Sequence, residues 1–292
     1  MINIKGKLFS LERPVVMGIL NVTPDSFFDG SWQQNESGIR NRIETIISEG
    51  GAIIDVGGYS SRPGAVEIAP DEEWRRLEPA LKILAKDYPA MPASIDTFRT
   101  DLAKRAVVEY GVSMINDISG GTIDGKMFET VAGLNVPYIL MHMRGTSQTV
   151  HQYMESGSDS NGNSGQTRHQ YTEFERFTED VMLWFAEQLT VLRSLGVNDV
   201  ILDPGFGFGK TLEQNYQLMR NLNRFSLLFD CPLLVGVSRK SMIYNLLDCT
   251  AEDSLNGTTV LNTCALLNGV DILRVHDVKE AVEVVRLVEK LK

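Results

Sequence analysis

Short apolar runs recur along the chain, and polar residues follow most of them. Eight such runs occupy residues 14–20, 52–56, 92–95, 112–115, 136–140, 200–202, 232–237 and 270–273. Apolar runs of this length without strict alternation are typical of strands buried on both faces of a parallel sheet. Segments with helical periodicity separate most of the runs, and weak alternation over residues 1–13 indicates an N-terminal hairpin.

The number of these β-then-α units predicts the fold class. Alternating strands and helices indicate an α/β protein with a parallel sheet. Eight units fit a closed (β/α)8 TIM barrel, formed as a single domain by residues 1–292, because about 250 residues is typical of such barrels. An open doubly wound sheet is the alternative. We favour the barrel because polar residues lie at essentially every strand C-terminus, where such barrels build their sites.

One polar segment interrupts the alternation after the fifth predicted strand. Its centre, residues 156–165, contains only Ser, Gly, Asp and Asn. Such a composition cannot bury enough apolar surface to offset the entropy lost on ordering. We therefore predict a mobile surface insertion over residues 155–170, followed by an amphipathic helix over residues 174–195.

Composition and charge narrow the classes of partner. The chain has 28 Lys and Arg residues against 38 Asp and Glu residues, a formal net charge of −10. A diffuse acidic surface argues against nucleic-acid and membrane partners, although a local basic cluster can still bind a small anionic substrate. The three cysteines lack C-x-x-C spacing, which predicts reduced thiols in a cytoplasmic protein. We expect no signal peptide and no membrane span.

The stretch after the sixth predicted strand raises the question of a nucleotide site. Gly209-Lys210-Thr211 matches the end of a P-loop, but Pro204 stands where that motif needs its first glycine. The dinucleotide-binding fingerprint fails as well, because its third glycine would fall on Lys210. We therefore reject both nucleotide interpretations and predict a scaffold role for Lys210.

Polar side chains at the strand ends would converge on one mouth of the barrel. They are Asn21, Arg62, Asp96, Asn116, His142, Arg144, Asp203, Lys240, Ser241, Arg274 and His276. Two carboxylates, an amide and an ammonium beside apolar side chains suit a flat heterocycle with ring N–H, NH2 and carbonyl groups. Arg62, Arg274 and His276 form a predicted cation cluster for phosphate oxygens. Asn21 offers a hard oxygen to Mg²⁺, which takes its other ligands from phosphates and water.

Several polar residues also have a purely structural interpretation. An aspartate after a strand is usually a turn former or an N-cap, and we assign Asp55, Asp117 and Asp277 to that class. His142 fits a packed, hydrogen-bonded histidine as well as it fits a site residue. Residues 72–76 fit a solvated helix face with pairs between positions three apart.

Eight motifs in order resemble the dihydropteroate synthase family. Among them are Asp55-Val-Gly-Gly-Tyr-Ser-Ser-Arg-Pro-Gly64 and Gly236-Val-Ser-Arg-Lys-Ser241. The others span residues 17–27, 94–97, 115–120, 141–145, 202–210 and 274–278. The resemblance covers about residues 14–290 in register, and eight motifs in order are highly specific.

The resemblance implies an activity, a cofactor and an assembly. Members of the family join 6-hydroxymethyl-7,8-dihydropterin pyrophosphate to 4-aminobenzoate in folate biosynthesis and release pyrophosphate. The resemblance thus implies small-molecule substrates, Mg²⁺ bound by Asn21, and a homodimer formed through helices late in the barrel. The catalytic residues it implies are Asp96, Asp203, Lys240 and Arg274.

The same resemblance implies binding roles at the remaining positions. The pterin ring would be bound by Asp96, Asn116, Asp203 and Lys240, in a slot shaped by Met143, Gly207, Phe208 and Gly236. The pyrophosphate would lie near Asn21, Ser61, Arg62, Arg274 and His276. The aminobenzoate would lie near Ser61, Arg62, Pro63 and Ser241, with Phe27 and Asp29 on a first loop that closes over the substrates.

Two departures from the family pattern accompany these expectations. Residues 59–61 read Tyr-Ser-Ser where the family commonly has Glu-Ser-Thr, so Ser61 keeps the hydroxyl and Tyr59 is the larger change. The predicted insertion over 155–170 is longer than usual. Two other functions stay open at this point, a pterin-binding methyltransferase barrel and a non-catalytic pterin-binding protein.

Overall fold

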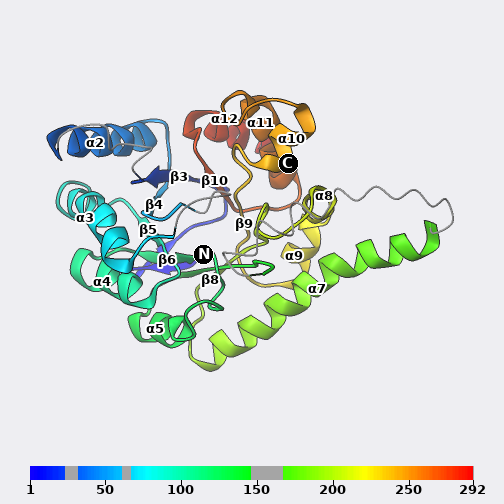
Figure 1. Ribbon diagram of the computed structural model, residues 1–292, viewed down its shortest axis with the longest axis horizontal. Coiled ribbons are helices and arrows are strands. Elements are labelled where there is room, and N and C mark those ends of the chain that lie inside the picture. The colour runs from blue at the N-terminus through cyan, green and yellow to red at the C-terminus, as the bar shows by residue number, and fades with distance from the viewer. Residues whose placement is uncertain (24–31, 61–66, 146–166, 292) are drawn as a thin grey trace.

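Eight parallel strands form the centre of the structure, a computed structural model that describes residues 1–23, 32–60, 67–145 and 167–291 (Figure 1). They are β3 (Val15–Asn21), β4 (Ile53–Gly57), β5 (Ala93–Asp96), β6 (Met114–Asp117), β7 (Tyr138–Met141), β8 (Val200–Asp203), β9 (Leu234–Val235) and β10 (Ile272–Val275). Each coincides with one of the eight predicted runs to within about two residues at most ends.

The sheet closes on itself. The strand order is β8-β7-β6-β5-β4-β3-β10-β9, and all of these pairs are parallel. The two outer strands meet through a parallel bridge between Leu202 and Leu233, where the Leu202 N–H donates to the Pro232 carbonyl at 2.9 Å. The predicted closed barrel is therefore confirmed, and the open doubly wound sheet is excluded.

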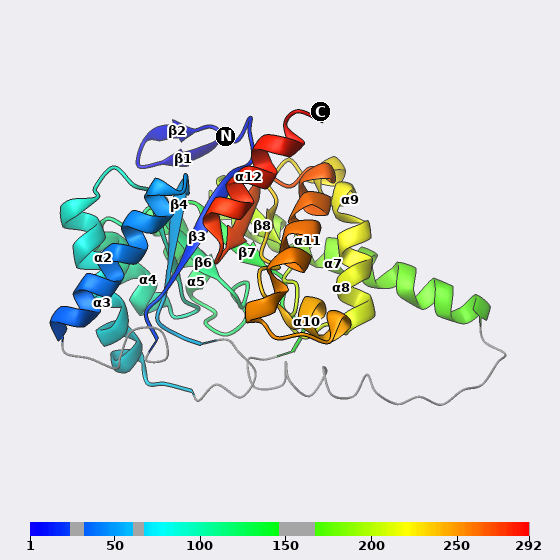
Figure 2. The same ribbon diagram turned by 90° about the horizontal axis from the view of Figure 1, so that it is seen from above.

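Helices surround the barrel (Figure 2). They are α2 (Trp32–Ser48), α3 (Pro70–Asp87), α4 (Thr100–Tyr110), α5 (Met127–Leu134), α7 (Thr167–Ser194), α8 (Leu212–Arg220), α9 (Leu222–Leu228), α10 (Ser241–Leu247), α11 (Leu255–Leu267) and α12 (Val278–Val288). The periodicity did not predict α5 and α9, which have eight and seven residues, because two turns carry too short a pattern.

The helix after the predicted insertion begins earlier than expected. It starts at residue 167 instead of 174, so residues 167–170 are its first turn and do not belong to an irregular segment. The rest of the predicted insertion, residues 155–166, lies outside the described residues. Among the described residues, no helix is both long and apolar enough to cross a bilayer.

Two layers fill the barrel, because alternate residues of a strand point inward. The lower layer is apolar, and it contains Met17, Ile53, Met114, Ile139, Ile201, Leu234 and Ile272. Two residues further along the same strands, the inward positions become Ile19, Asp55, Asn116, Met141, Asp203, Gly236 and Arg274. The next inward-pointing residue of each strand thus lies at the polar mouth instead of in the apolar core.

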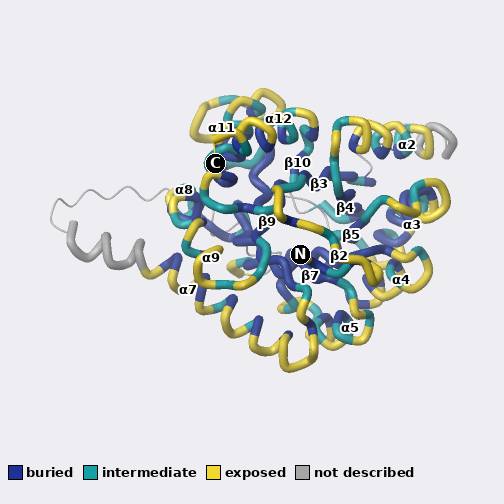
Figure 3. The backbone as a smooth tube through the Cα atoms, turned by 180° about the vertical axis from the view of Figure 1, so that it is seen from behind, coloured by how far each residue is buried: buried dark blue, intermediate teal, exposed yellow. Residues whose placement is uncertain are grey.

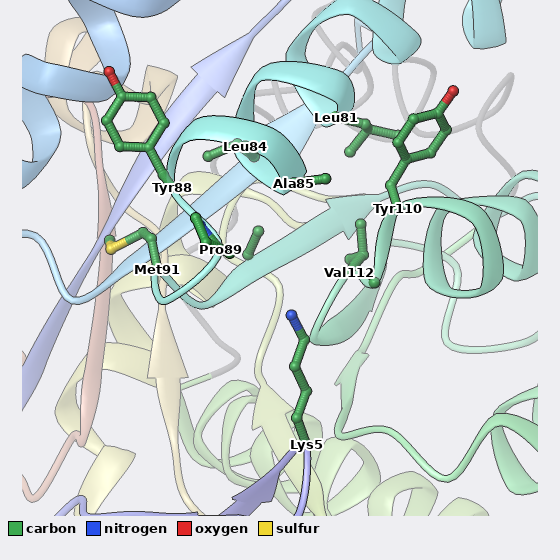
Figure 4. A pocket seen from close by; sticks show the side chains of 11 residues that line it. Lys5, Leu81, Leu84, Ala85, Tyr88, Pro89, Met91, Tyr110 and Val112 are labelled. Atoms are coloured by element: carbon green, nitrogen blue, oxygen red, sulfur yellow. The ribbon is translucent and has the colours of Figure 1, made fainter.

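The N-terminal hairpin covers the opposite end of the barrel. Strands β1 (Ile2–Ile4) and β2 (Lys7–Phe9) pair in antiparallel fashion, as predicted, and Ile2 and Ile4 pack against the lower apolar layer. A pocket of about 60 Å³ lies at this end, where Lys5 faces side chains of α3 and α4 such as Leu81 and Tyr110 (Figure 4). Its lining shares no residue with the predicted site.

The larger core lies between the barrel and its helices. Outward strand residues such as Val16, Ile54 and Leu202 pack against helix residues such as Leu77 and Phe185. Figure 3 shows the barrel strands as largely buried and the outer sides of the helices as exposed. This rigid shell fixes the strand ends from which the site is built.

Candidate active site

The strand ends place three predicted site residues in one row. Asn21 at the end of β3 is in register with Gly57, Gly57 with Asp96, and Asp96 with Asn116. Because Gly57 lacks a side chain, the side chains on either side approach the same point. A Cβ built on Gly57 would lie 3.3 Å from Asn21 Oδ1 and 3.6 Å from Asp96 Oδ2. Two oxygens therefore border one space at the mouth.

A buried ion-pair network joins this row to β10. Arg274 donates through Nη2 to Asp96 Oδ2 at 2.6 Å and through Nε to Asp55 Oδ2 at 2.6 Å. Asp55 is fully buried and also accepts from Asn116 Nδ2 at 3.0 Å and from the Ser94 hydroxyl. Our assignment of Asp55 as a turn former or N-cap is therefore wrong.

The turn after β8 holds the second carboxylate. Asp203 is buried, and its Oδ1 accepts from the Gly205 N–H at 2.8 Å. Gly205 and Gly207 have φ of +69° and +81°, a region that favours glycine. A Cβ on Gly205 would lie 2.0 Å from the His142 carbonyl oxygen, and one on Gly207 would lie 3.4 Å from Lys240 Cδ. The glycines thus permit the close approach of this turn to its neighbours.

Lys240 comes from the loop after β9 and lies against the same turn. Its Nζ donates to the Phe206 carbonyl at 2.6 Å and lies 4.6 Å from the centroid of the Phe208 ring. Met143 and Phe208 pack against a cluster formed by Phe98, Ile118 and Met141. The charged groups therefore adjoin an apolar wall, as predicted for Met143 and Phe208.

Burial shifts the pKa values of these groups toward neutrality. It raises the pKa of Asp96 to about 7 against the opposing effect of Arg274, and it also raises the pKa of Asp203 against Lys240. Burial lowers the pKa of Lys240 to about 8, with Asp203 opposing. Burial alone would lower the pKa of Arg274, but Asp55 and Asp96 raise it. The mouth therefore combines the permanent cation Arg274 with Asp96 and Lys240, whose pKa values lie near neutrality.

The other predicted residues of this part of the mouth follow β9 and β10 in the chain. His276 Nδ1 lies 3.1 Å from the Ser238 hydroxyl, and burial lowers the pKa of His276 to about 4. The imidazole is therefore neutral at pH 7, which corrects its place in the predicted cation cluster. A Cβ on Gly236 would lie 3.7 Å from Arg274 Cβ, and Ser241 begins α10 directly after Lys240.

Several structural interpretations can be tested as well. Lys210 is buried and donates to the carbonyls of His142, Gly205 and Phe208 at 2.9, 2.8 and 3.1 Å, which confirms its scaffold role. Asp117 accepts from the N–H groups of Ser119 and Gly121 and is a turn former, as predicted.

Two other assignments need correction, and His142 fits the packed histidine that was one of its two interpretations. Asp277 makes no side-chain cap and instead receives Arg239 at 3.0 and 2.7 Å. Glu73 is fully buried, with Arg99 at 2.9 Å and the Thr97 hydroxyl at 2.7 Å, so it does not belong to a solvated helix face. His142 packs edge-on against Trp184 at 5.1 Å, and its Nδ1 has no hydrogen-bond partner among the described residues.

Five predicted site residues fall in segments that the structure does not describe. They are Phe27, Asp29, Ser61, Arg62 and Pro63, and their roles stay predictions. Conversely, the sequence interpretation omitted Asp55, Gly57 and Phe98. The period-two spacing from Ile53 to Asp55 and Gly57 was the available signal, because it carries the inward face of β4 from the core to the mouth.

Comparison with known proteins places the chain in a family. Residues 17–276 match the family model for pterin binding enzymes. The dihydropteroate synthase of Escherichia coli (strain K12) is 37% identical over 287 residues, which cover 98% of this chain and 94% of that protein. The folic acid synthesis protein fol1 of Pneumocystis carinii is 38% identical over 278 residues, which cover 93% of this chain and 35% of that longer protein.

Solved structures agree with this assignment. The Yersinia pestis dihydropteroate synthase in a sulfonamide drug complex superimposes with a TM-score of 0.83 and 35% identity, and the match covers 99% of this chain and 98% of that one. The Xanthomonas albilineans dihydropteroate synthase with 4-aminobenzoic acid gives a TM-score of 0.82 and 32% identity, with 99% and 97% covered.

The closed barrel, with paired carboxylates, an amide and a lysine at its mouth, defines a pterin-binding enzyme. Within that class, the chain belongs to the dihydropteroate synthase family of transferases in folate biosynthesis.

Proposed function

We propose that this chain condenses 6-hydroxymethyl-7,8-dihydropterin pyrophosphate with 4-aminobenzoate to give 7,8-dihydropteroate and pyrophosphate. The observation that carries the proposal is the convergence of Asp96, Asn116, Asp203 and Lys240 from four strand ends beside the wall of Met143 and Phe208. Both substrates are small molecules, and the Xanthomonas albilineans relative solved with 4-aminobenzoic acid supports the second one.

The polar groups match the edge of a pterin. Carboxylates accept from ring N–H and exocyclic NH2 groups, an ammonium donates to a carbonyl or ring nitrogen, and an amide can do both. Asn116 and Asp203 supply these groups from buried positions, and Asp96 and Lys240 supply them from half-buried ones. Because the surroundings are apolar, an unmatched heterocycle would leave buried polar groups without partners, which costs about 1–3 kcal/mol each.

The reaction breaks the C–O bond between the pterin methylene and the pyrophosphate. The electron pair leaves on the pyrophosphate, and Arg274 stabilises the charge that develops there. The pterin carries the positive charge that remains, and the buried carboxylate of Asp203 favours this cation. The neutral aniline nitrogen then forms the C–N bond with its lone pair and releases a proton to water. No general base is needed, because the amine is already neutral.

We propose Mg²⁺ as the cofactor, held by Asn21. The described residues contain no group of three or more His, Cys, Asp or Glu side chains that could hold a metal ion. Mg²⁺ at a phosphate substrate needs only one or two protein oxygens, and Asn21 Oδ1 lies at the barrel mouth, 3.3 Å from the position of a Cβ on Gly57. The residues present thus fit this ion, which would supply additional charge stabilisation to the leaving pyrophosphate.

We further propose a cytoplasmic homodimer. All three cysteines are free, in keeping with a reducing compartment. Exposed apolar side chains lie on α10 and α11, namely Leu246, Leu247, Val260 and Leu267, and these neighbouring helices (Figure 2) fit the expected dimer face. Sedimentation equilibrium of the wild type and of Val260→Arg tests this assembly: the wild type should be dimeric and the variant should dissociate, whereas a monomeric wild type overturns it.

The decisive experiment measures pyrophosphate released from the pterin pyrophosphate with and without 4-aminobenzoate. We expect release to depend on the amine and to be matched by formation of dihydropteroate. Pterin binding without turnover would support the non-catalytic alternative. Methyl transfer from a reduced folate to a corrinoid would support the methyltransferase alternative.

A further inference from the structure

One carboxylate oxygen inside the barrel receives donors from two other strand ends. Asp55 Oδ2 accepts from Asn116 Nδ2 at 3.0 Å and lies 2.6 Å from both Nε and Nη2 of Arg274. The other oxygen, Oδ1, accepts from the Ser94 hydroxyl. Asp55 has no exposed surface, so it cannot touch a substrate at the mouth. All three residues that form hydrogen bonds with it act as donors, so both of its buried oxygens are satisfied.

The two residues that meet on this oxygen serve opposite ends of one substrate in the proposed function, on which this inference rests. Asn116 would form hydrogen bonds with the pterin ring, and Arg274 would bind the pyrophosphate. We infer that Asp55 is a positioning residue that fixes Asn116 and Arg274 relative to each other, and so sets the spacing between the ring and the leaving group. It acts through these two side chains only.

Asp96 cannot supply this function alone. It also receives Arg274 at 2.6 Å, but its side chain is 19% exposed, whereas the side chain of Asp55 is completely buried. Asp96 is partly open to the mouth, so a bound pterin can take the place of Arg274 on its carboxylate. Asp55 keeps Arg274 in place during that exchange, because no ligand can reach it. The guanidinium therefore has one permanent partner and one exchangeable partner.

The test compares two substitutions of this aspartate. Asp55→Asn keeps the shape, since its carbonyl can still accept from Asn116 and Arg274 while its NH2 donates to the Ser94 hydroxyl. Asp55→Ala removes the acceptor entirely. Binding of 6-hydroxymethylpterin, which lacks phosphate, and of inorganic pyrophosphate is measured separately by calorimetry. We expect Asp55→Ala to weaken both by about tenfold, in line with the loss of a charged hydrogen bond, and Asp55→Asn to weaken both less.

The two possible roles of Asp55 predict opposite signs. If Asp55 acted only as a negative charge, its neutralisation in Asp55→Asn would tighten the binding of anionic pyrophosphate. A positioning role predicts weaker binding instead, and this measurement decides the question even if Asp55→Ala does not fold. Tighter pyrophosphate binding, or a loss confined to one of the two ligands, overturns the inference.

Glu73→Gln is the matched control. Glu73 is also fully buried and also receives one arginine and one hydroxyl, from Arg99 and Thr97, but neither donor belongs to the site. We expect it to lower the melting temperature to a similar degree as Asp55→Asn and to change both affinities much less, because its charge acts on Asp96 only from a distance. Equal affinities in all variants overturn the inference. A wild type that binds neither ligand would instead contradict the proposed function.

Discussion

Lys240 Nζ lies 4.6 Å from the centroid of the Phe208 ring and donates to the Phe206 carbonyl at 2.6 Å. The ammonium is therefore held by the turn after β8 although it comes from the loop after β9. This contact fixes a donor beside the apolar wall before a ligand arrives. It also ties the position of Lys240 to the aromatic character of residue 208.

Phe208→Leu should weaken pterin binding and leave the KM for 4-aminobenzoate nearly unchanged. The substitution keeps an apolar side chain but removes the ring face, a cation–π contact worth about 0.5–2 kcal/mol, so we expect the Kd for 6-hydroxymethylpterin to rise about three- to tenfold. Phe229→Leu removes a ring that packs against the core away from the mouth and serves as the control. An unchanged Kd in Phe208→Leu would show that the contact does not position Lys240.

The affinity for a pterin should increase as the pH rises through about 7. Burial raises the pKa of Asp96 to about 7, and only the ionised carboxylate can accept from two N–H groups of the ring. Calorimetry with a pterin that lacks pyrophosphate, between about pH 5.5 and about pH 7.5, measures this rise below the pKa of Lys240 and without titration of the phosphates. An affinity that stays constant across this range would contradict the assignment.

The same shift has a consequence for stability. The folded pKa of Asp96 lies above the ordinary value of 3.8, so the folded state holds this proton more tightly than the unfolded state. Its contribution to stability is present below about pH 4 and is lost as the pH rises to about 7. Asp96→Asn should therefore flatten the pH dependence of the melting temperature over this interval, while Asp101→Asn, at an exposed position on α4, should not. Identical pH profiles of the two variants would contradict this reasoning.

The fold was predictable because each strand is buried on both faces, a pattern that needs no knowledge of the partner strands. The row of Asn21, Asp96 and Asn116 was predictable for the same reason, since polar residues that end parallel strands meet at one mouth. Asp55 was not, because a single aspartate before two glycines is typical of a turn. Its partner Arg274 lies 219 positions away.

Burial explains the other differences. His276 looks like a cation in the sequence, but its surroundings lower its pKa to about 4, and no local pattern reports that burial. Glu73 stands among charged neighbours on α3, and its burial depends on Arg99, which comes from the loop before another helix. Each of these outcomes depends on residues that are distant in sequence.

Tyr59→Ala should raise the KM for 4-aminobenzoate more than the KM for the pterin substrate. The Tyr59 ring packs edge-on against Phe98 at 5.3 Å, and the Arg99 guanidinium lies 5.8 Å from its centroid. Tyr59 thus attaches the start of the 57–64 loop to the loop that follows Asp96. The family resemblance assigns aminobenzoate contacts to the 57–64 loop. An aromatic pair contributes about 0.5–1.5 kcal/mol, so we expect an increase of about two- to tenfold.

Tyr59→Phe is the control for this substitution, because it keeps the ring and removes only the hydroxyl. It should retain nearly the wild-type KM for both substrates. If Tyr59→Phe has the same effect as Tyr59→Ala, the hydroxyl and not the ring contact with Phe98 supports the loop. If neither variant changes the aminobenzoate KM, the position has no role in that part of the site.

Removal of Mg²⁺ should abolish turnover and spare the binding of a pterin that lacks phosphate. Asn21 Oδ1 borders the space in front of Gly57, on the other side of which lies Asp96 Oδ2. A hard cation there would be coordinated by oxygens of the pyrophosphate and not by the pterin ring. Asn21→Ala should therefore raise the Mg²⁺ concentration that gives half-maximal kcat by about tenfold, whereas Asn21→Asp, which adds a charged oxygen, should lower it. Gly57→Ala tests the same position without removing the proposed metal ligand, because its Cβ would lie 3.3 Å from Asn21 Oδ1. Full activity after chelation, or an Asn21→Ala variant with the wild-type Mg²⁺ requirement, would show that the ion is bound elsewhere or not needed.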